Sequence, residues 1–267
     1  MKVYLMTDLE GVAGVWKWEE RDDTSTENFE YRMRARSLLT QEVNAAVEGL
    51  LAAGVEDVLV IDGHGPGGIW FPDLHPKAKL MHGRPLASES VRNRIVATYD
   101  VGILVGQHAM AGVADGDLAH TQSSRAIDSY TLNGIPIGET AQFALKCGAL
   151  GLPTIFLSGD TAACREVEEL VPGITTAAVK QGLSRNSAIS MSKEAARDLI
   201  RERVQQAVEK QRADPLPPLV LDPPYILVKR YFHTDSADRA AEQPYVERLD
   251  SQTVQLRSDN ILDILYH

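Results

Sequence analysis

Two short apolar segments on either side of an amphipathic helix are the feature that most constrains this chain. Residues 2–7 are predicted to form a buried strand, residues 34–53 carry apolar side chains at helical spacing, and residues 58–61 form a second apolar run. Gly54 follows the predicted helix and is expected to end it. A strand–helix–strand unit joins parallel strands through a right-handed crossover, so we expect a parallel sheet that is buried on both faces.

The alternation of strands and helices continues to about residue 190. We therefore predict an α/β fold with a mostly parallel central sheet flanked by helices. Residues 20–32 are polar and charged and are predicted to form a surface loop. The other elements predicted here are strands at 101–105, 154–157 and 174–179, a hairpin at 130–137 with an Asn-Gly turn, and helices at 139–150 and up to residue 170.

The pattern changes after about residue 190. A long charged helix is predicted from Ser192 to about residue 211, a proline-rich segment follows it, and strands near 225–232 and 252–257 precede a final helix. We expect an α/β domain over residues 1–190, which carries the candidate catalytic residues described below, and a smaller α+β domain over residues 191–267.

Composition excludes several classes of partner. The 267 residues have a formal net charge of −10 and no cluster of Lys or Arg, so nucleic acid is not expected as a partner. No membrane association is expected, because no run of about 20 apolar residues occurs. Acidic residues precede any long apolar region, so no secretory signal is predicted and a cytoplasmic location is expected. Cys147 and Cys164 are predicted to be buried free thiols in helices.

Three predicted strands end in residues that bind metals. Asp8 and Glu10 follow the first strand, His64 follows the second and His108 follows the third. In open α/β sheets ligands bind beyond the carboxyl ends of the strands. Asp8 and Glu10 lie two residues apart and point the same way, and a bound cation would relieve their repulsion. Glu139, at the start of a predicted helix, could join the same site.

Each of these residues also has an ordinary structural explanation. Asp8 alone could cap a turn, and His108 alone could be a hydrogen-bonded structural histidine. Their joint occurrence favours a metal site. His120, which lies between His108 and the hairpin, could move protons there because its ordinary pKa is near neutrality. Asp62 lies two residues before His64 and is predicted to orient its imidazole. No motif for a nucleotide cofactor, a serine nucleophile or a catalytic cysteine is found.

At this point the residues match a known pattern. The chain resembles the D-aminopeptidase family of zinc-dependent peptidases over at least residues 1–190. Met6 stands where the family hallmark has Ser. The segments that carry the resemblance are Asp8-Leu9-Glu10-Gly11, Asp62-Gly63-His64, Gly106-Gln107-His108-Ala109, Ala119-His120-Thr121, Ile137-Gly138-Glu139 and the stretch from Ser158 to Lys180.

The resemblance implies a centre with two zinc ions per chain. Asp8 would bridge both ions, with Glu10 and His64 completing one site and His108 and Glu139 completing the other. Members of the family assemble as homo-oligomeric rings that enclose their active sites, so a homo-oligomer is expected here. These assignments come from the family, and they fall on the residues that the strand ends had already indicated.

We therefore predict a metal-dependent aminopeptidase that acts on short peptides, including peptides with an N-terminal D-residue, in which His120 moves a proton or stabilises the oxyanion. One alternative is a two-metal phosphoesterase, although the motifs offer no Arg or Lys to hold a phosphate. Another is a non-catalytic peptide-binding ring protein of a peptide uptake system. Five protein ligands shared by two ions leave coordination positions open, which favours catalysis.

Overall fold

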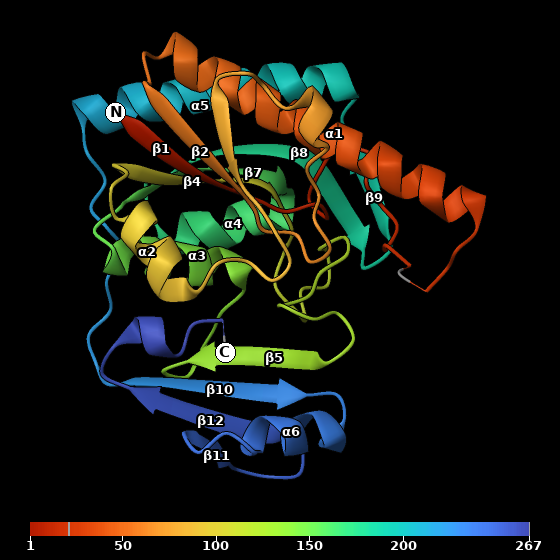
Figure 1. Ribbon diagram of the computed structural model, residues 1–267, viewed down its shortest axis with the longest axis vertical. Coiled ribbons are helices and arrows are strands. Elements are labelled where there is room, and N and C mark those ends of the chain that lie inside the picture. The colour runs from red at the N-terminus through yellow and green to blue at the C-terminus, as the bar shows by residue number, and fades with distance from the viewer. Residues whose placement is uncertain (21, 267) are drawn as a thin grey trace.

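The computed structural model describes residues 1–20 and 22–266 and contains two sheets (Figure 1). All neighbouring strands of the larger sheet are parallel except the last pair, so the predicted α/β fold is confirmed. Its strand order is β3 (Ala78–Met81), β2 (Asp57–Asp62), β1 (Lys2–Thr7), β4 (Val101–Gln107), β7 (Thr154–Asp160), β8 (Thr175–Ser184) and β9 (Ser187–Ser190).

Helices cover both faces of the larger sheet (Figure 1). One face packs against α1 (Thr26–Ala52) and α5 (Lys193–Ala213), and the other packs against α2 (Glu89–Val96), α3 (Glu139–Ala149) and α4 (Thr161–Leu170). Alternate side chains of each strand enter opposite cores, as the strand period requires. In β1, Val3 and Leu5 pack in the core under α1 and α5, and Tyr4 packs in the core under α3.

The smaller sheet is antiparallel. Leu145 of α3 packs in its core, whereas Phe143 packs in the core of the larger sheet, so α3 is held between the two sheets. The order is β11 (Val246–Arg248), β12 (Thr253–Ser258), β10 (Tyr225–Tyr231), β5 (Ile127–Leu132) and β6 (Ile135–Pro136), with α6 (Thr234–Ala241) and a short 3-10 helix, η2 (Ile261–Asp263), beside it.

The predicted strands of the central sheet, the helix at 139–150 and the hairpin are confirmed. Asn133 and Gly134 have φ values of 51° and 81°, as an Asn-Gly hairpin turn requires. Two elements differ from expectation. Helix α1 begins at Thr26, because the Ser25 side chain accepts a hydrogen bond from the backbone N–H of Asn28, so the second half of the predicted surface loop is helical. The final helix is a single 3-10 turn, because tertiary packing of Ile261 against the smaller sheet decides its geometry.

The two sheets do not divide the chain at residue 190. Strands β5 and β6, which precede that residue, belong to the smaller sheet, and α5, which follows it, packs against α1 and β8. A division into two domains at this point therefore stays a prediction. Cys147 and Cys164 are buried free thiols, as expected. Among residues 1–20 and 22–266, no helix is long and apolar enough to cross a membrane.

Candidate metal centre

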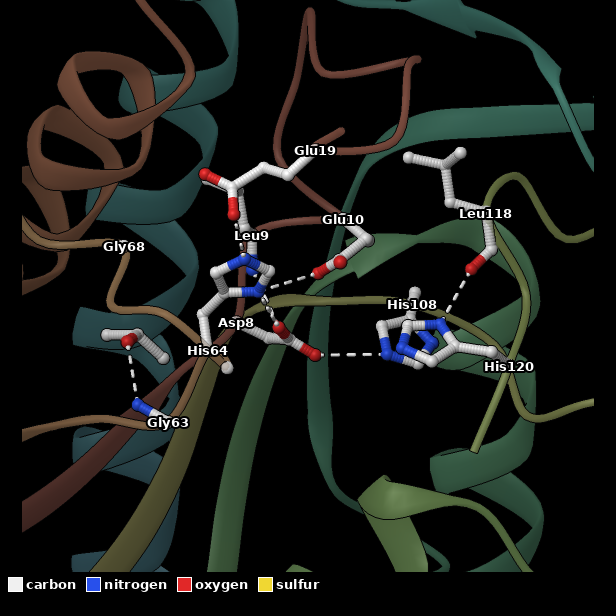
Figure 2. Close-up of polar contacts among 12 residues, drawn as sticks. Asp8, Leu9, Glu10, Glu19, Gly63, His64, Gly68, His108, Leu118 and His120 are labelled. Atoms are coloured by element: carbon white, nitrogen blue, oxygen red, sulfur yellow. Dashed lines mark hydrogen bonds and ion pairs between the residues drawn. The ribbon is translucent and has the colours of Figure 1, made fainter. Parts of the chain in front are cut away.

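The candidate ligands converge because β2, β1 and β4 are neighbours in the sheet. Their carboxyl ends deliver His64, Asp8 and His108 to one edge (Figure 2). The N-terminus of α3 delivers Glu139 to the same place. The loop that follows β1 is pressed against the end of β4: the backbone N–H of Asp8 donates to Val105 O at 2.9 Å. The four residues predicted from the strand ends, which include Glu10, and Glu139, predicted at a helix start, are all brought together here.

Glycines make this close approach of backbones possible. A Cβ on Gly11 would lie 2.0 Å from the carbonyl oxygen of Gln107, and so would a Cβ on Gly159 of β7. Gly106 has a φ of +80°, and a Cβ there would lie 2.2 Å from the carbonyl oxygen of Asp8. The backbone around Gln107 is therefore surrounded by positions that only glycine can occupy without a shift of the main chain.

Asp8 lies between two imidazoles (Figure 2). His64 Nδ1 is 3.2 Å from Asp8 Oδ1, and His108 Nε2 is 3.0 Å from Asp8 Oδ2. Glu10 Oε2 lies 3.1 Å from His64 Nδ1, and Glu139 Oε1 lies 3.5 Å from His108 Nε2. One carboxylate thus offers one oxygen to each half of the cluster, with a second carboxylate and an imidazole on each side.

Hydrogen bonds on the outer side of each ring fix the tautomers. His64 Nε2 lies 3.2 Å from Glu19 Oε2, and His108 Nδ1 lies 2.8 Å from the carbonyl oxygen of Ala109. These oxygens can only accept, so the outer nitrogens carry the protons. When a metal ion replaces the remaining protons of the rings, the inner nitrogens, His64 Nδ1 and His108 Nε2, direct their lone pairs at the cluster, which is how histidine binds a metal.

Burial and neighbouring charges act in opposite directions on the pKa values of the cluster residues. Burial would raise the pKa of Asp8, but the His108 and His64 imidazoles outweigh burial and hold that pKa below its usual range. Burial would lower the pKa of His64 and of His108, but the surrounding carboxylates raise both well above the ordinary value. The buried carboxylates therefore require positive charge, which protons supply here and a metal ion would supply in their place.

The donor atoms fit a metal. Oxygen and nitrogen atoms of Asp8, Glu10 and His108 lie within 4.8 Å of one another, and so do those of His108, His120 and Glu139. Glu10 Oε2 and His108 Nε2 are buried and have no hydrogen-bond partner among the described residues. Carboxylate and imidazole ligands of this kind suit zinc and its neighbours in the transition series.

His120 lies at the edge of the cluster. Its ring stacks on His108 with centroids 3.9 Å apart, and its Nε2 lies 4.0 Å from Glu139 Oε1. Its Nδ1 lies 2.9 Å from the carbonyl oxygen of Leu118, so Nδ1 carries the proton and Nε2 has a free lone pair (Figure 2). Burial, and after it the charge on His108, lower the pKa of His120, which favours a neutral ring.

Glu19 is a site residue that sequence reasoning missed. Besides its contact with His64, its carboxylate lies 3.4 Å from Arg32 Nε and 4.0 Å from an Arg36 nitrogen, both in α1. It comes from an irregular loop, which has no periodic signal to reveal it. Asp62, which was predicted to orient His64, instead accepts hydrogen bonds from the backbone of Gly68 at 2.9 Å and Ile69 at 3.2 Å, so it shapes the loop after β2.

Lys180 of β8 holds the loop that carries Glu10. Its ammonium group is fully buried, donates to the carbonyl oxygens of Glu10 and Val15, and lies 2.8 Å from the buried Asp117 Oδ2. Because a buried charge needs partners, this lysine ties together segments that are far apart in the sequence. Nothing in the local sequence around residue 180 indicates this contact.

A cavity of about 460 Å³ opens onto the cluster. Asp8, Glu10, His64 and Glu139 lie at its base, with Trp18, Ser123 and Arg125 among the residues of its walls. The arrangement can hold one or two cations at the floor of a cavity that is large enough for a small organic substrate. The fold and the cluster thus define an α/β protein with a metal-dependent hydrolytic site.

Comparisons with known proteins agree with this class. The model of the D-aminopeptidase family matches residues 1–267. A D-aminopeptidase of Bacillus subtilis (strain 168) is 30% identical over 270 residues, which cover 98% of this chain and 93% of the relative. A solved structure, described as the Zn-dependent D-aminopeptidase DppA from Bacillus subtilis, a self-compartmentalizing protease, superposes with a TM-score of 0.85 at 28% identity, covering 98% of this chain and 93% of that one.

The chain belongs to the D-aminopeptidase family. It is a metal-dependent aminopeptidase, as predicted from the sequence. The comparisons favour this function over the two alternatives, a phosphoesterase and a non-catalytic binding protein. The geometry agrees: among the described residues that line the main cavity, the arginine is Arg125, which is exposed and paired with Glu20 at 3.2 Å, so it is not committed to holding a phosphate.

Proposed function

We propose that the chain is a zinc-dependent aminopeptidase that removes the N-terminal residue from short peptides, including peptides that begin with a D-residue. The observation that carries the proposal is the position of Asp8, whose two oxygens each lie about 3 Å from the inner nitrogen of a different histidine. The related D-aminopeptidases, one of which is described as Zn-dependent, support the choice of zinc and of peptide substrates.

We assign two zinc ions to the cluster. Asp8 would hold both, with Glu10 and His64 as the further ligands of one ion and His108 and Glu139 as those of the other. The split agrees with the contacts, because Glu10 lies beside His64 and Glu139 lies beside His108. When bound, zinc lowers the pKa of a water molecule and polarises the scissile carbonyl.

His120 moves the proton in this mechanism. Because Nδ1–H donates to Leu118, the lone pair on Nε2 accepts the proton of the attacking water. The same nitrogen then returns that proton to the leaving amine. Stacking on His108 holds the ring at the edge of the cluster, and Nε2 faces the main cavity where substrate would bind.

Metal content and hydrolysis measured together test this proposal. Protein offered zinc is expected to hold two ions per chain by elemental mass spectrometry and to release alanine from L- or D-alanyl peptides. Chelation should abolish release, and added zinc should restore it. Two ions without any peptide hydrolysis would contradict the proposed reaction, and protein that takes up no metal would contradict the site.

Glu19 is predicted to position His64 for the metal. Glu19→Gln keeps the size of the side chain but removes the charge that holds Nε2–H, so zinc affinity should fall about 10- to 100-fold. Competition with a coloured chelator measures this. Glu20→Gln is the matched control, because Glu20 is an exposed neighbour without contact to His64 and should bind zinc as the unmodified chain does. Equal affinity in both variants would show that Glu19 has no such role.

We also propose a homo-oligomer, in line with the self-compartmentalizing relative, in the form of a ring that encloses its active sites. Analytical ultracentrifugation is expected to show one closed species larger than the monomer. A monomer at micromolar concentration would contradict this. The cytoplasmic location inferred from the sequence stays a prediction.

A further inference from the structure

A second cavity continues from the metal centre into the molecule. It has a volume of about 170 Å³ and shares Asp8, Gly63, Gln122 and Glu139 with the main cavity. Because a water molecule accounts for about 30 Å³ of liquid, the space equals about five waters, which suits a carboxylate with a small residue attached. Its far end is lined by Arg92, Lys146 and Tyr266, with Leu86 and Tyr4 beside them.

The far end of this cavity has more positive than negative charge. The Lys146 ammonium lies 3.0 Å from Glu89 Oε1, and an Arg92 nitrogen lies 3.5 Å from the same oxygen, so two cations share one carboxylate. The side chain of Lys146 is only 7% exposed. The carboxylates on the shared wall, Asp8 and Glu139, are already engaged by imidazoles.

Arg92 and Tyr266 supply two further hydrogen-bond donors at the same end of the cavity. Arg92 Nε and the Tyr266 hydroxyl are buried and lack a hydrogen-bond partner among the described residues. The Tyr266 ring also lies 5.2 Å from the Lys146 ammonium, so its hydroxyl and that ammonium belong to one cluster. Buried donors without partners are costly, and a carboxylate ligand would satisfy both.

Helix geometry sets the distance between this cluster and the metal centre. Glu139 and Lys146 are seven residues apart in α3, which places them on one face, about 10 Å apart along the axis. Both side chains tilt toward the helix N-terminus, so this spacing is kept at their ends. An extended peptide advances about 3.5 Å per residue. A carboxylate at Lys146 therefore lies within about three residues of a carbonyl held at the metals.

We infer that this cavity is a carboxylate-binding subsite, in which Lys146, Arg92 and Tyr266 bind a substrate carboxylate while the metal centre cleaves the N-terminal peptide bond. The inference rests on the proposed aminopeptidase function and adds to it a preference for one kind of peptide. The distance along α3 assigns the carboxylate to the free C-terminus of a short peptide, from a dipeptide to a tetrapeptide. An acidic side chain is the other possible source of the same group.

The test compares alanyl-alanine with its C-terminal amide, in whichever enantiomer is hydrolysed. The unmodified enzyme should favour the free acid about 10- to 100-fold in kcat/KM, chiefly through KM, which is the size of effect expected of a charge-assisted hydrogen bond. In Lys146→Met this ratio should fall to near one, and Lys146→Arg should retain much of it. Lys229→Met is the matched control, because Lys229 is a buried lysine that lines a different cavity, and it should keep the original ratio.

A second arm identifies the source of the carboxylate. Aspartyl-alanine amide is compared with asparaginyl-alanine amide. A preference for aspartyl that disappears in Lys146→Met would support the subsite and assign it to a side chain. A preference for the free C-terminal acid that disappears in Lys146→Met would support the subsite and assign the carboxylate to the C-terminus of a short peptide. Equal hydrolysis within both pairs by the unmodified enzyme, or a preference that survives in Lys146→Met, would overturn the inference.

Two further measurements cover a variant that fails to fold. Tyr266→Phe removes a single hydroxyl and should lower the acid-to-amide ratio severalfold. Calorimetric binding of an alanyl-alanine analogue with a reduced, uncleavable bond should favour its free acid over its amide in the unmodified enzyme, and no difference would overturn the inference. Intact peptide hydrolysis without an acid preference overturns the subsite alone, whereas absence of any hydrolysis contradicts the proposed function.

Discussion

Asp8→Asn is expected to lose both zinc ions and to lower peptide hydrolysis by more than about 1,000-fold. The amide keeps the shape of the side chain, but it removes the charge of the residue that contacts both His64 and His108. Each ion loses an anionic ligand, and the remaining carboxylates, Glu10 and Glu139, each reach only one histidine among the contacts described.

Elemental mass spectrometry after dialysis measures the loss of zinc, and alanine release measures activity. Asp57→Asn provides the matched control, because Asp57 begins β2, at the opposite end of that strand from the cluster, and lies 2.6 Å from Lys79 Nζ. This control should keep two ions. Asp8→Asn protein that retains two ions would remove Asp8 as the shared ligand.

His120→Ala is expected to keep its zinc and to lower kcat about 100- to 10,000-fold, with little change in KM, which is the range for loss of a general acid–base group. The His120 ring stacks on His108 and is not one of the proposed zinc ligands. Its Nε2, which has a free lone pair, faces Glu139. Added imidazole should restore part of the rate, because the main cavity is open to the ring that was removed.

Metal content decides between two roles for His120. Its Nε2 lies within 4.8 Å of ligand atoms of His108 and Glu139, so it could also bind an ion. Loss of one zinc in His120→Ala would make it a ligand, and normal turnover would remove it from the mechanism. His82→Ala, in which the ring removed stacks on Phe71 rather than on a site residue, is the control and should behave as the unmodified chain does.

The candidate ligands that follow strands could be predicted from the sequence alone. A short continuous apolar run locates a buried parallel strand, and its last residues lie at the carboxyl edge of the sheet wherever the strand pairs. Asp8, His64 and His108 could therefore be grouped from the sequence. Glu139 followed from its place at a helix start. These predictions needed only local periodicity and one rule about α/β sheets.

The residues that support the ligands could not be predicted in this way. Glu19 reaches His64 from an irregular loop, and Lys180 reaches Glu10 from a strand 170 residues further along the chain. Lys146 and Tyr266 lie on different elements whose meeting depends on how α3 is held between the two sheets. Each contact is tertiary, and no periodic pattern records it.

The three glycines around Gln107 limit how this chain can vary. Gly11, Gly106 and Gly159 lie on three different segments, yet all three bring backbone against backbone at distances that no side chain fits. In a library that samples every amino acid at each position, variants selected for bound metal should retain glycine at these places as strictly as they retain the ligands. The positions that do not tolerate mutation would then be of two kinds: the metal ligands, and the glycines that the close approach of the backbones requires.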